Sequence, residues 1–393
     1  MTLGTTPDTR RARIAGVYEH PARELPDTST EQLHAEVALG ALEDAGLSMA
    51  DVDAYFCAGD APGFGALSMS EYLGLRPSYM DTTEGGGASY LSHVGHAAAA
   101  IAAGKCDVAL VTMGGRPRSG GPQPGESMLA DAPEGDFERL LGLTVPASYA
   151  LAARRHMYEY GTTSEDLAEI RVAASLHAQH NQFAVRRTPV SVEDVLASPL
   201  VADPLHVLDC CLITDGGGAL VLVRPEVARE LRRPCVTVLG HGEAVRHTDG
   251  GRVDLTRTAA DESGARAFRE AGVTPDDIDY ASIYDSFTIT VLLSLEDLGF
   301  CAKGEGGRFV RDGALVSPHG RLPINTDGGG LCNNHPGNRG GMTKVIEAVR
   351  QLRGEAHPAV QVPDCALAVA HGTGGSLGTR IANATLVLGR DGE

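Results

Sequence analysis

An internal repeat constrains the fold of this 393-residue chain more than any other feature. The stretch ALEDAGLSMADVDAY at 41–55 matches AFREAGVTPDDIDYA at 267–281, with alanine, glycine and aspartate at equivalent positions. Each copy has the order helix, glycine stop, turn and strand. A looser pair of helix–glycine–strand stretches follows in the same order, at 96–115 and 343–375. We therefore predict a layered α/β fold with two duplicated halves, 1–225 and 226–393.

Composition and charge narrow the classes of partner and compartment. Acidic residues outnumber basic ones by 51 to 33, a net charge of −18. This field repels phosphate backbones and anionic lipids, so we expect neither nucleic acid nor membrane as a partner. Eight cysteines without CxxC spacing predict reduced thiols and no disulfide framework. An N-terminus without an apolar signal segment favours a cytoplasmic protein.

One segment of the first half differs from its surroundings. Residues 114–145 are irregular and rich in glycine and proline, and two amphipathic helices are predicted after them, at 147–160 and 164–180. The motif TTSEDL is a predicted N-terminal cap of the second helix. Within that helix, HAQH at 177–180 lacks a third ligand, so we predict surface histidines and no metal site. We interpret about 114–205 as an inserted loop domain that covers a site or an interface.

Four glycine-flanked stretches carry the candidate chemistry. The stretch TEGGGASYLSHVGH at 83–96 opens a helix with Ser89 near its start. In YDSFTITVLLSLEDLGF, Tyr284 and Asp285 follow an apolar strand. The loop NTDGGGLCNNHPGNRGG contains His335, and HGTGGSLGTR begins with His371 after the strand CALAVA. Polar groups beside glycines at strand and helix ends are typical of a site where backbone approaches a ligand closely.

The order of these motifs resembles the thiolase superfamily, in particular the sterol-carrier-protein type and the lipid-transfer-protein-like steroid side-chain aldolases. The resemblance rests on GGGAS, YDSFT…LEDLGF…KGEGG, NTDGGG…HPGN and the closing HGTGG…ATLVLG. It covers nearly the whole chain. It implies a five-layer αβαβα sandwich, a loop domain over an acyl-CoA channel, a homodimer and a role in lipid or steroid metabolism.

The chain departs from this family pattern at its most reactive positions. Thiolases carry a nucleophilic cysteine at the start of the buried helix, where the helix dipole lowers the thiol pKa. Here Gly87 stands at about that place, followed by Ala88 and Ser89. Tyr284 replaces the histidine before the family's aspartate, and Asn334 replaces the glycine before His335. The steroid-type aldolases resemble this chain in having the same glycine and tyrosine.

The remaining residues favour an aldol or retro-aldol reaction on a β-hydroxyacyl-CoA. A serine without a dedicated base is a weak nucleophile, whereas retro-aldol cleavage needs only a base and donors for the enolate oxygen. We predict proton exchange between Tyr284 and His371, with Asp285 in the same catalytic set. The predicted oxyanion and substrate contacts are His335, Gly87, Ala88, Ser89, Asn334 and Gly372. A thiolase or acyltransferase using Ser89 or Cys332 is the second hypothesis, and a non-catalytic acyl-CoA or lipid carrier is the third.

The resemblance also implies binding partners. The substrate is a coenzyme A thioester, and no bound cofactor or metal is expected. Family members that lack parts of the thiolase machinery work with a small OB-fold, zinc-ribbon protein that binds CoA, so we expect such a subunit. Arginines near the inserted segment are candidate contacts for the CoA phosphates: Arg154, Arg155, Arg186 and Arg187.

Overall fold

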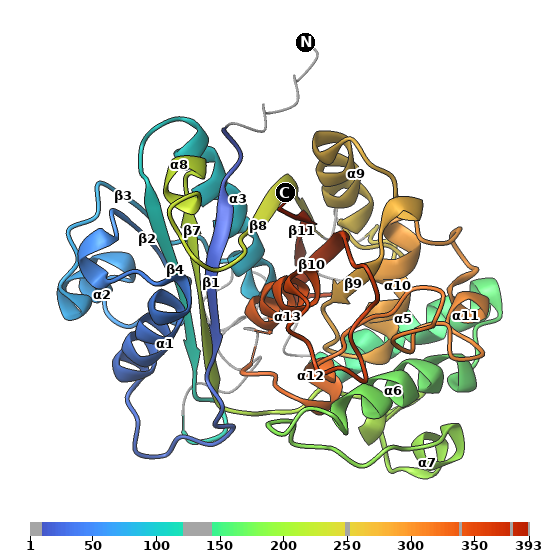
Figure 1. Cartoon of the computed structure of the whole chain (residues 1–393). Coiled ribbons are helices and arrows are strands. Elements are labelled where there is room, and N and C mark those ends of the chain that lie inside the picture. The colour runs from blue at the N-terminus through green and yellow to red at the C-terminus, as the bar shows by residue number, and fades with distance from the viewer. Residues whose placement is uncertain (1–9, 121–143, 248–251, 338–339, 378–379, 392–393) are drawn as a thin grey trace.

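A nine-stranded sheet organises the molecule (Figure 1). The computed structural model describes residues 10–120, 144–247, 252–337, 340–377 and 380–391. The strand order is β3-β2-β4-β7-β1-β8-β11-β10-β9. The strands are β1 (Arg13–Glu19), β2 (Ala54–Phe56), β3 (Tyr79–Asp81), β4 (Val108–Gly115), β7 (Gly216–Val223), β8 (Val236–Arg246), β9 (Tyr280–Ile283), β10 (Leu367–Ser376) and β11 (Arg380–Arg390).

The two ends of this sheet repeat one pattern of connections. In the first, β1 pairs antiparallel with β7, β7 antiparallel with β4, and β4 parallel with β2. In the second, β8 pairs antiparallel with β11, β11 antiparallel with β10, and β10 parallel with β9. Among the described strands, a short β1–β8 ladder at Arg13 and Ile14 joins the two. The boundary at 225/226 stays a prediction.

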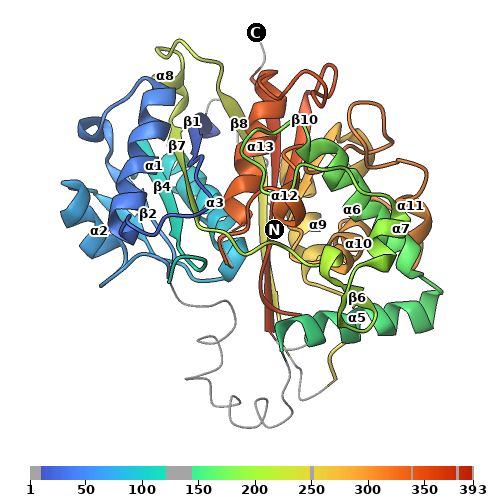
Figure 2. The same ribbon diagram turned by 90° about the horizontal axis from the view of Figure 1, so that it is seen from below.

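Helices cover and separate the two parts of the sheet (Figures 1 and 2). Helix α1 contacts β1, β4 and β7, and α9 contacts β8 and β11, while α3 and α13 contact strands of both parts. This arrangement confirms the predicted layered α/β class. The helices are α1 (Thr30–Ala45), α2 (Ala66–Leu73), α3 (Ser89–Ala102), α5 (Val145–Tyr160), α6 (Ser164–Ala178), α7 (Val192–Ala197), α8 (Pro225–Ala228), α9 (Ala260–Ala271), α10 (Thr288–Asp297), α11 (Gly306–Phe309), α12 (Gly329–Cys332) and α13 (Gly341–Arg353).

The sequence repeat marks two equivalent helix–strand crossings. A Cβ on Gly16 of β1 would lie 2.1 Å from the carbonyl oxygen of Ala41 in α1. A Cβ on Gly240 of β8 would lie 2.2 Å from the carbonyl oxygen of Ala267 in α9. The repeated alanines and the strand glycines therefore allow each outer helix to approach its sheet closely.

The inserted segment is only partly described. Residues 121–143, most of the predicted irregular stretch, lie outside the described residues. The predicted helices at 147–160 and 164–180 are confirmed as α5 and α6, and Thr163 and Asp166 form the predicted capping box. A small hairpin follows, β5 (Leu200–Ala202) with β6 (Leu205–His206). No helix in the described ranges combines the length and apolarity needed to cross a bilayer.

Two local expectations were wrong. The strand CALAVA does not end before His371, because β10 continues through HGTGGS to Ser376, where the glycine run pairs with β11 in an antiparallel ladder. His177 is not a surface residue. Its ring is buried, and Nε2 accepts the backbone N–H of Ser317 at 2.8 Å. All eight cysteines are free, as predicted.

Substitution of Gly16 or Gly240 by alanine should destabilise the fold. The added Cβ would meet a helix carbonyl that cannot rotate away, and overpacking of this kind costs about 1–3 kcal/mol. Urea unfolding of Gly16→Ala and Gly240→Ala tests this, with Leu39→Ala on the exposed side of α1 as the control. Unchanged unfolding midpoints in both glycine variants would contradict the close-crossing account.

Candidate active site

The start of α3 lies directly against the ring of Tyr284. A short 3₁₀ turn, Gly86–Ala88, leads into the helix and is buried. A Cβ on Gly87 would lie 2.3 Å from Cε2 of Tyr284 and 2.4 Å from the carbonyl oxygen of Thr373. Both distances are shorter than real Cβ contacts. A side chain at position 87 therefore requires the tyrosine ring to move.

Tyr284 and His335 form a buried pair beside this turn. Tyr284 follows β9, and its backbone N–H donates to the carbonyl oxygen of His371 at 2.9 Å. The tyrosine oxygen lies 2.9 Å from Nε2 of His335, with the rings in an edge-to-face arrangement at 5.4 Å. Burial lowers the pKa of His335 to about 4. The imidazole is therefore neutral near pH 7, and Nε2 can accept the tyrosine hydroxyl hydrogen.

Thr214 holds His335 in place from a distant part of the chain. The backbone N–H of His335 donates to Oγ1 of Thr214 at 2.9 Å, and the backbone N–H of Thr214 donates to the carbonyl oxygen of His335 at 3.3 Å. We did not identify Thr214 from the sequence. A signal was present, since TDGGG at 214–218 recurs as TDGGG at 326–330, in the loop that leads to His335.

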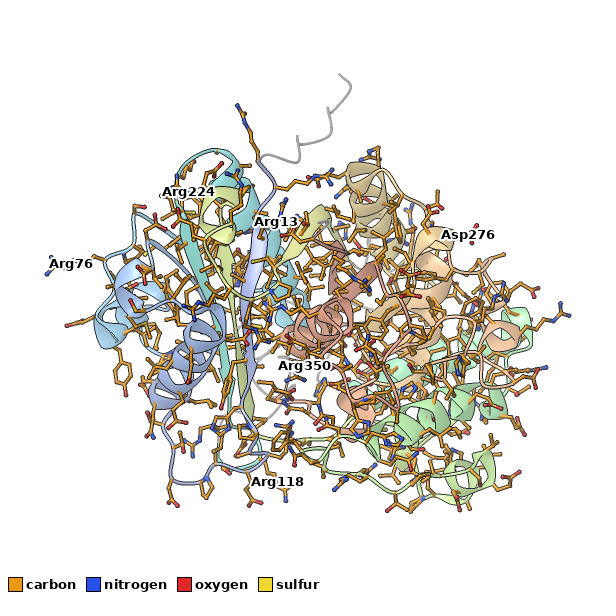
Figure 3. All side chains as sticks on the ribbon, in the orientation of Figure 1. Arg13, Arg76, Arg118, Arg224, Asp276 and Arg350 are labelled. Carbon is orange, nitrogen blue, oxygen red and sulfur yellow. The ribbon has the colours of Figure 1, made fainter. Side chains whose placement is uncertain are left out.

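The side chain of Asn334 belongs to this support. Its Oδ1 accepts from Oγ1 of Thr214 at 2.8 Å, and its Nδ2 donates to Glu19 at 3.1 Å. Burial acts to raise the pKa of Glu19, but the cations of Arg23 and Arg350 hold it below its usual value. Arg350 lies on α13, at the middle of the view in Figure 3. Because both ends of the Asn334 amide are engaged, this geometry does not support the predicted substrate contact.

Asp285 fastens the short helix α12, which precedes His335. Its carboxylate accepts the backbone N–H groups of Gly330 at 2.9 Å and Leu331 at 3.1 Å, and Nζ of Lys344 lies 2.7 Å away. Burial acts to lower the pKa of Lys344, but the Asp285 carboxylate raises it above its usual value. These three partners tie the carboxylate to the loop, and the catalytic role of Asp285 stays a prediction.

His371 and Gly372 face opposite sides of β10. A Cβ on Gly372 would lie 2.8 Å from the carbonyl oxygen of Gly87, so this residue is beside the start of α3 as predicted. The ring of His371 contacts Thr385 at 2.9 Å and Asn383 at 3.2 Å on the neighbouring strand β11. That face of β11 is covered by α9. The predicted proton exchange between His371 and Tyr284 does not fit this arrangement, because successive side chains of a strand point to opposite faces.

The two alternative nucleophiles are in unfavourable surroundings. Oγ of Ser89 is buried and accepts the backbone N–H of Gly85 at 2.8 Å. The N–H of Ala88 is also engaged, with the carbonyl oxygen of Gly85 at 3.2 Å. Burial raises the pKa of the Cys332 thiol to about 12. Since the thiolate is the reactive form, Cys332 is a poor nucleophile at neutral pH.

The four predicted CoA-binding arginines separate into two kinds. Arg154 and Arg155 are exposed and form ion pairs with Asp203 and Glu159. Arg187 is exposed and donates to the carbonyl oxygen of Gln179 at 3.0 Å. Arg186 differs from these, because part of its guanidinium is buried. Within the described ranges, no group of three or more histidine, cysteine or acidic side chains could hold a metal ion.

Comparison with known proteins identifies the family. The family described as thiolase C-terminal domain-like matches residues 242–390. An acetyl-CoA acetyltransferase from Methanothermobacter thermautotrophicus is 36% identical over 94% of this chain and 98% of its own length. The chain belongs to the thiolase superfamily. A steroid side-chain-cleaving aldolase from Thermomonospora curvata is also 36% identical, over 87% of this chain and 90% of its own length.

A solved structure from the same superfamily matches the fold closely. The structure described as Ltp2-ChsH2(DUF35) aldolase is 34% identical, with a TM-score of 0.86, and the match covers 97% of this chain and 98% of that chain. Superfamily members named as acetyltransferase and as aldolase are equally similar to this sequence. Overall similarity therefore does not distinguish acyl transfer from aldol cleavage, and the distinction has to come from the geometry of the site.

NMR of the histidine rings should find His335 neutral and His96 charged at pH 7. Burial lowers the pKa of His335 to about 4, whereas hydrogen bonding to Glu243 raises the pKa of His96 to about 9. Unfolded histidine has a pKa of about 6.5, so the contribution of His335 to stability is lost as the pH falls below that value. Labelled histidine spectra recorded from pH 4 to 10 test both assignments. Titration of both rings near pH 6.5 would contradict the buried Tyr284–His335 pair.

Proposed function

We propose that this chain is an acyl-CoA carbon–carbon lyase that catalyses a retro-aldol reaction without a bound cofactor. The contact between Gly87 and Tyr284 carries the proposal. Because the tyrosine ring fills the space next to position 87, the start of α3 has no room for the nucleophilic side chain that an acyl-enzyme needs. The position instead offers backbone next to a tyrosine–histidine pair. A retro-aldol reaction requires proton transfer and oxyanion stabilisation but no covalent intermediate.

The Tyr284–His335 pair supplies a route for the proton. The β-hydroxyl of the substrate gives its proton to the Tyr284 oxygen while the tyrosine hydrogen moves to Nε2 of His335. The Cα–Cβ bond then breaks, its electron pair forms the thioester enolate, and the other fragment leaves as a ketone or aldehyde. Burial lowers the pKa of His335 to about 4, so the imidazolium is a stronger acid than that of an ordinary histidine. It returns the proton through Tyr284 to the enolate carbon.

The two other hypotheses receive less support. An acyltransferase would use Ser89 or Cys332. The Ser89 hydroxyl is buried and accepts the backbone N–H of Gly85. Burial raises the pKa of the Cys332 thiol to about 12. A non-catalytic carrier leaves no role for a tyrosine hydroxyl paired with a neutral histidine beside the glycine turn. The lyase proposal uses both.

We also propose that the protein works as a homodimer joined at the edge strand β3. Large apolar side chains are exposed there and on the neighbouring α2 segment. They are Phe64, Leu67, Tyr72 and Met80, with 84%, 59%, 54% and 51% of their surface exposed. Exposed apolar side chains at a sheet edge are typical of an interface.

The proposal also includes a partner subunit of a different kind and a set of arginines that bind the CoA phosphates. The solved aldolase described with ChsH2(DUF35) supports a heteromeric assembly, so we propose a small CoA-binding subunit with an OB fold and a zinc ribbon. Arg154, Arg155 and Arg187 lie on the surface and are our candidates for the CoA phosphates. Ion pairs with Asp203 and Glu159 would have to open for such binding.

Product analysis with a β-hydroxyacyl-CoA tests the reaction class. We expect a ketone or aldehyde and a shortened acyl-CoA, formed without added CoA. Tyr284→Phe should slow this reaction by about 10²–10⁴-fold, the usual range for loss of a proton-transfer group. The variant should stay folded, with a cost of about 1–3 kcal/mol because Nε2 of His335 loses its buried partner. A strict requirement for free CoA, with two thioester products, would instead indicate thiolysis.

Restoring a cysteine should fail while the tyrosine remains. Gly87→Cys should lower stability, because its Cβ meets the Tyr284 ring, and the same change should cost less in a Tyr284→Ala background. The contact with the Thr373 oxygen persists in both backgrounds, so part of the cost remains. Urea unfolding of the double-mutant cycle should give a favourable coupling of about 0.5–3 kcal/mol, as for residues in contact. Strictly additive effects would disprove the steric argument.

A further inference from the structure

Two arginines lie side by side behind the His335 loop. Only 1% of the Arg171 surface is exposed, and its Nη1 donates to the carbonyl oxygen of Leu331 at 2.8 Å and contacts Sγ of Cys332. The backbone N–H of Arg186 donates to the carbonyl oxygen of Cys332 at 2.9 Å. Both residues therefore adjoin the C-terminal end of α12, three positions before His335.

Each guanidinium has a buried N–H group without a hydrogen-bond partner. These groups are Nε of Arg171 and Nη1 of Arg186. In the described part of the chain, neither arginine forms an ion pair with a carboxylate. Burial, followed by the neighbouring Arg171 cation, lowers the pKa of Arg186. A buried cation beside a partly buried one, with N–H donors left over, is costly unless an anion completes the site.

A purely structural role explains only part of this arrangement. The C-terminal carbonyl groups of α12 attract positive charge, and Asp285 caps its other end. One buried arginine with its hydrogen bonds complete is sufficient for that purpose. Support of α12 therefore explains neither the guanidinium of Arg186 nor the two N–H groups that lack a hydrogen-bond partner.

We propose that Arg171 and Arg186 bind a carboxylate on the acyl part of the substrate, so that this enzyme acts on CoA thioesters of acyl groups with a second acid function. This inference rests on the proposed lyase function and specifies its substrate class. Guanidinium groups match carboxylate oxygens in geometry and charge.

The position of the pair favours an acyl carboxylate over a CoA phosphate. The CoA phosphates lie at the far end of the pantetheine arm from the reacting thioester, whereas Arg171 is buried beside the loop that carries His335. The segments that contain Val185 and Ile213 run along α12, because the backbone N–H groups of Arg186 and Leu212 donate to its carbonyl oxygens. Val185 and Ile213 are 41% and 52% exposed, which suits a hydrocarbon chain that leads to the carboxylate.

Binding of unreactive thioesters tests the proposal independently of turnover. Glutaryl-, adipyl- and pimelyl-CoA carry a terminal carboxylate, and valeryl-, hexanoyl- and heptanoyl-CoA are matched in length without it. By titration calorimetry, the wild-type protein should bind at least one member of the first series about 10- to 100-fold more tightly than its match, as charged hydrogen bonds allow. Arg186→Gln should abolish this preference, and Arg186→Lys should keep part of it. Arg229→Gln, an exposed site, is the control.

Each other outcome would overturn the inference. If Arg186→Gln weakens both series equally, and 3′-dephospho-CoA thioesters no longer show that loss, the arginine binds a CoA phosphate. If wild type shows no preference for any carboxylated chain, the arginines only support α12. Arg171→Gln is compared by urea unfolding as well, so that a folding defect is separated from a binding defect. Failure of the retro-aldol reaction alone would leave these binding results unchanged.

Discussion

The contact between the ring of Tyr284 and the backbone at Gly87 sets the chemistry open to this site. Helix α3 begins after the buried 3₁₀ turn Gly86–Ala88, which lies against Tyr284 and the carbonyl oxygen of Thr373. Tyr284 reaches this point from β9, and its ring occupies the space that a nucleophilic side chain would need. The same contact brings the tyrosine hydroxyl to His335. One ring therefore both fills the space beside Gly87 and supplies the hydroxyl that meets His335.

The residues around this contact hold it rigidly by buried polar interactions. Asp285 and Lys344 fasten the start of α12, and Thr214 fastens His335 through its backbone. Glu19 extends the network to β1, so that the loop is tied to both parts of the molecule. Removing one partner of such a network leaves a charged or polar group buried without compensation, which costs far more than the interaction itself contributes. This explains why so many ionisable groups surround a loop of only a few residues.

Patterns in the sequence predicted the layered α/β class and singled out Tyr284 and His335, but they paired Tyr284 with His371 because they do not show how strands orient side chains. The alanines of the repeat at 41–55 and 267–281 lie where two helices cross the sheet, against Gly16 and Gly240. Small residues repeated in a helix are a local pattern that the sequence can reveal. His371 was misjudged because its strand continues through a glycine run, and the face of a residue depends on that register. Thr214, Asn334 and Arg171 act through contacts between segments distant in sequence. Only the recurrence of TDGGG pointed to the first of them.

The central claim is that bond cleavage proceeds without a covalent acyl-enzyme. Intact-mass spectrometry of the protein, quenched during turnover of a β-hydroxyacyl-CoA, tests this directly. Our account predicts that the protein keeps its unmodified mass while ketone or aldehyde accumulates. An acyl adduct that maps to Ser89 or Cys332 would contradict it and would place this chain among the acyltransferases of its superfamily.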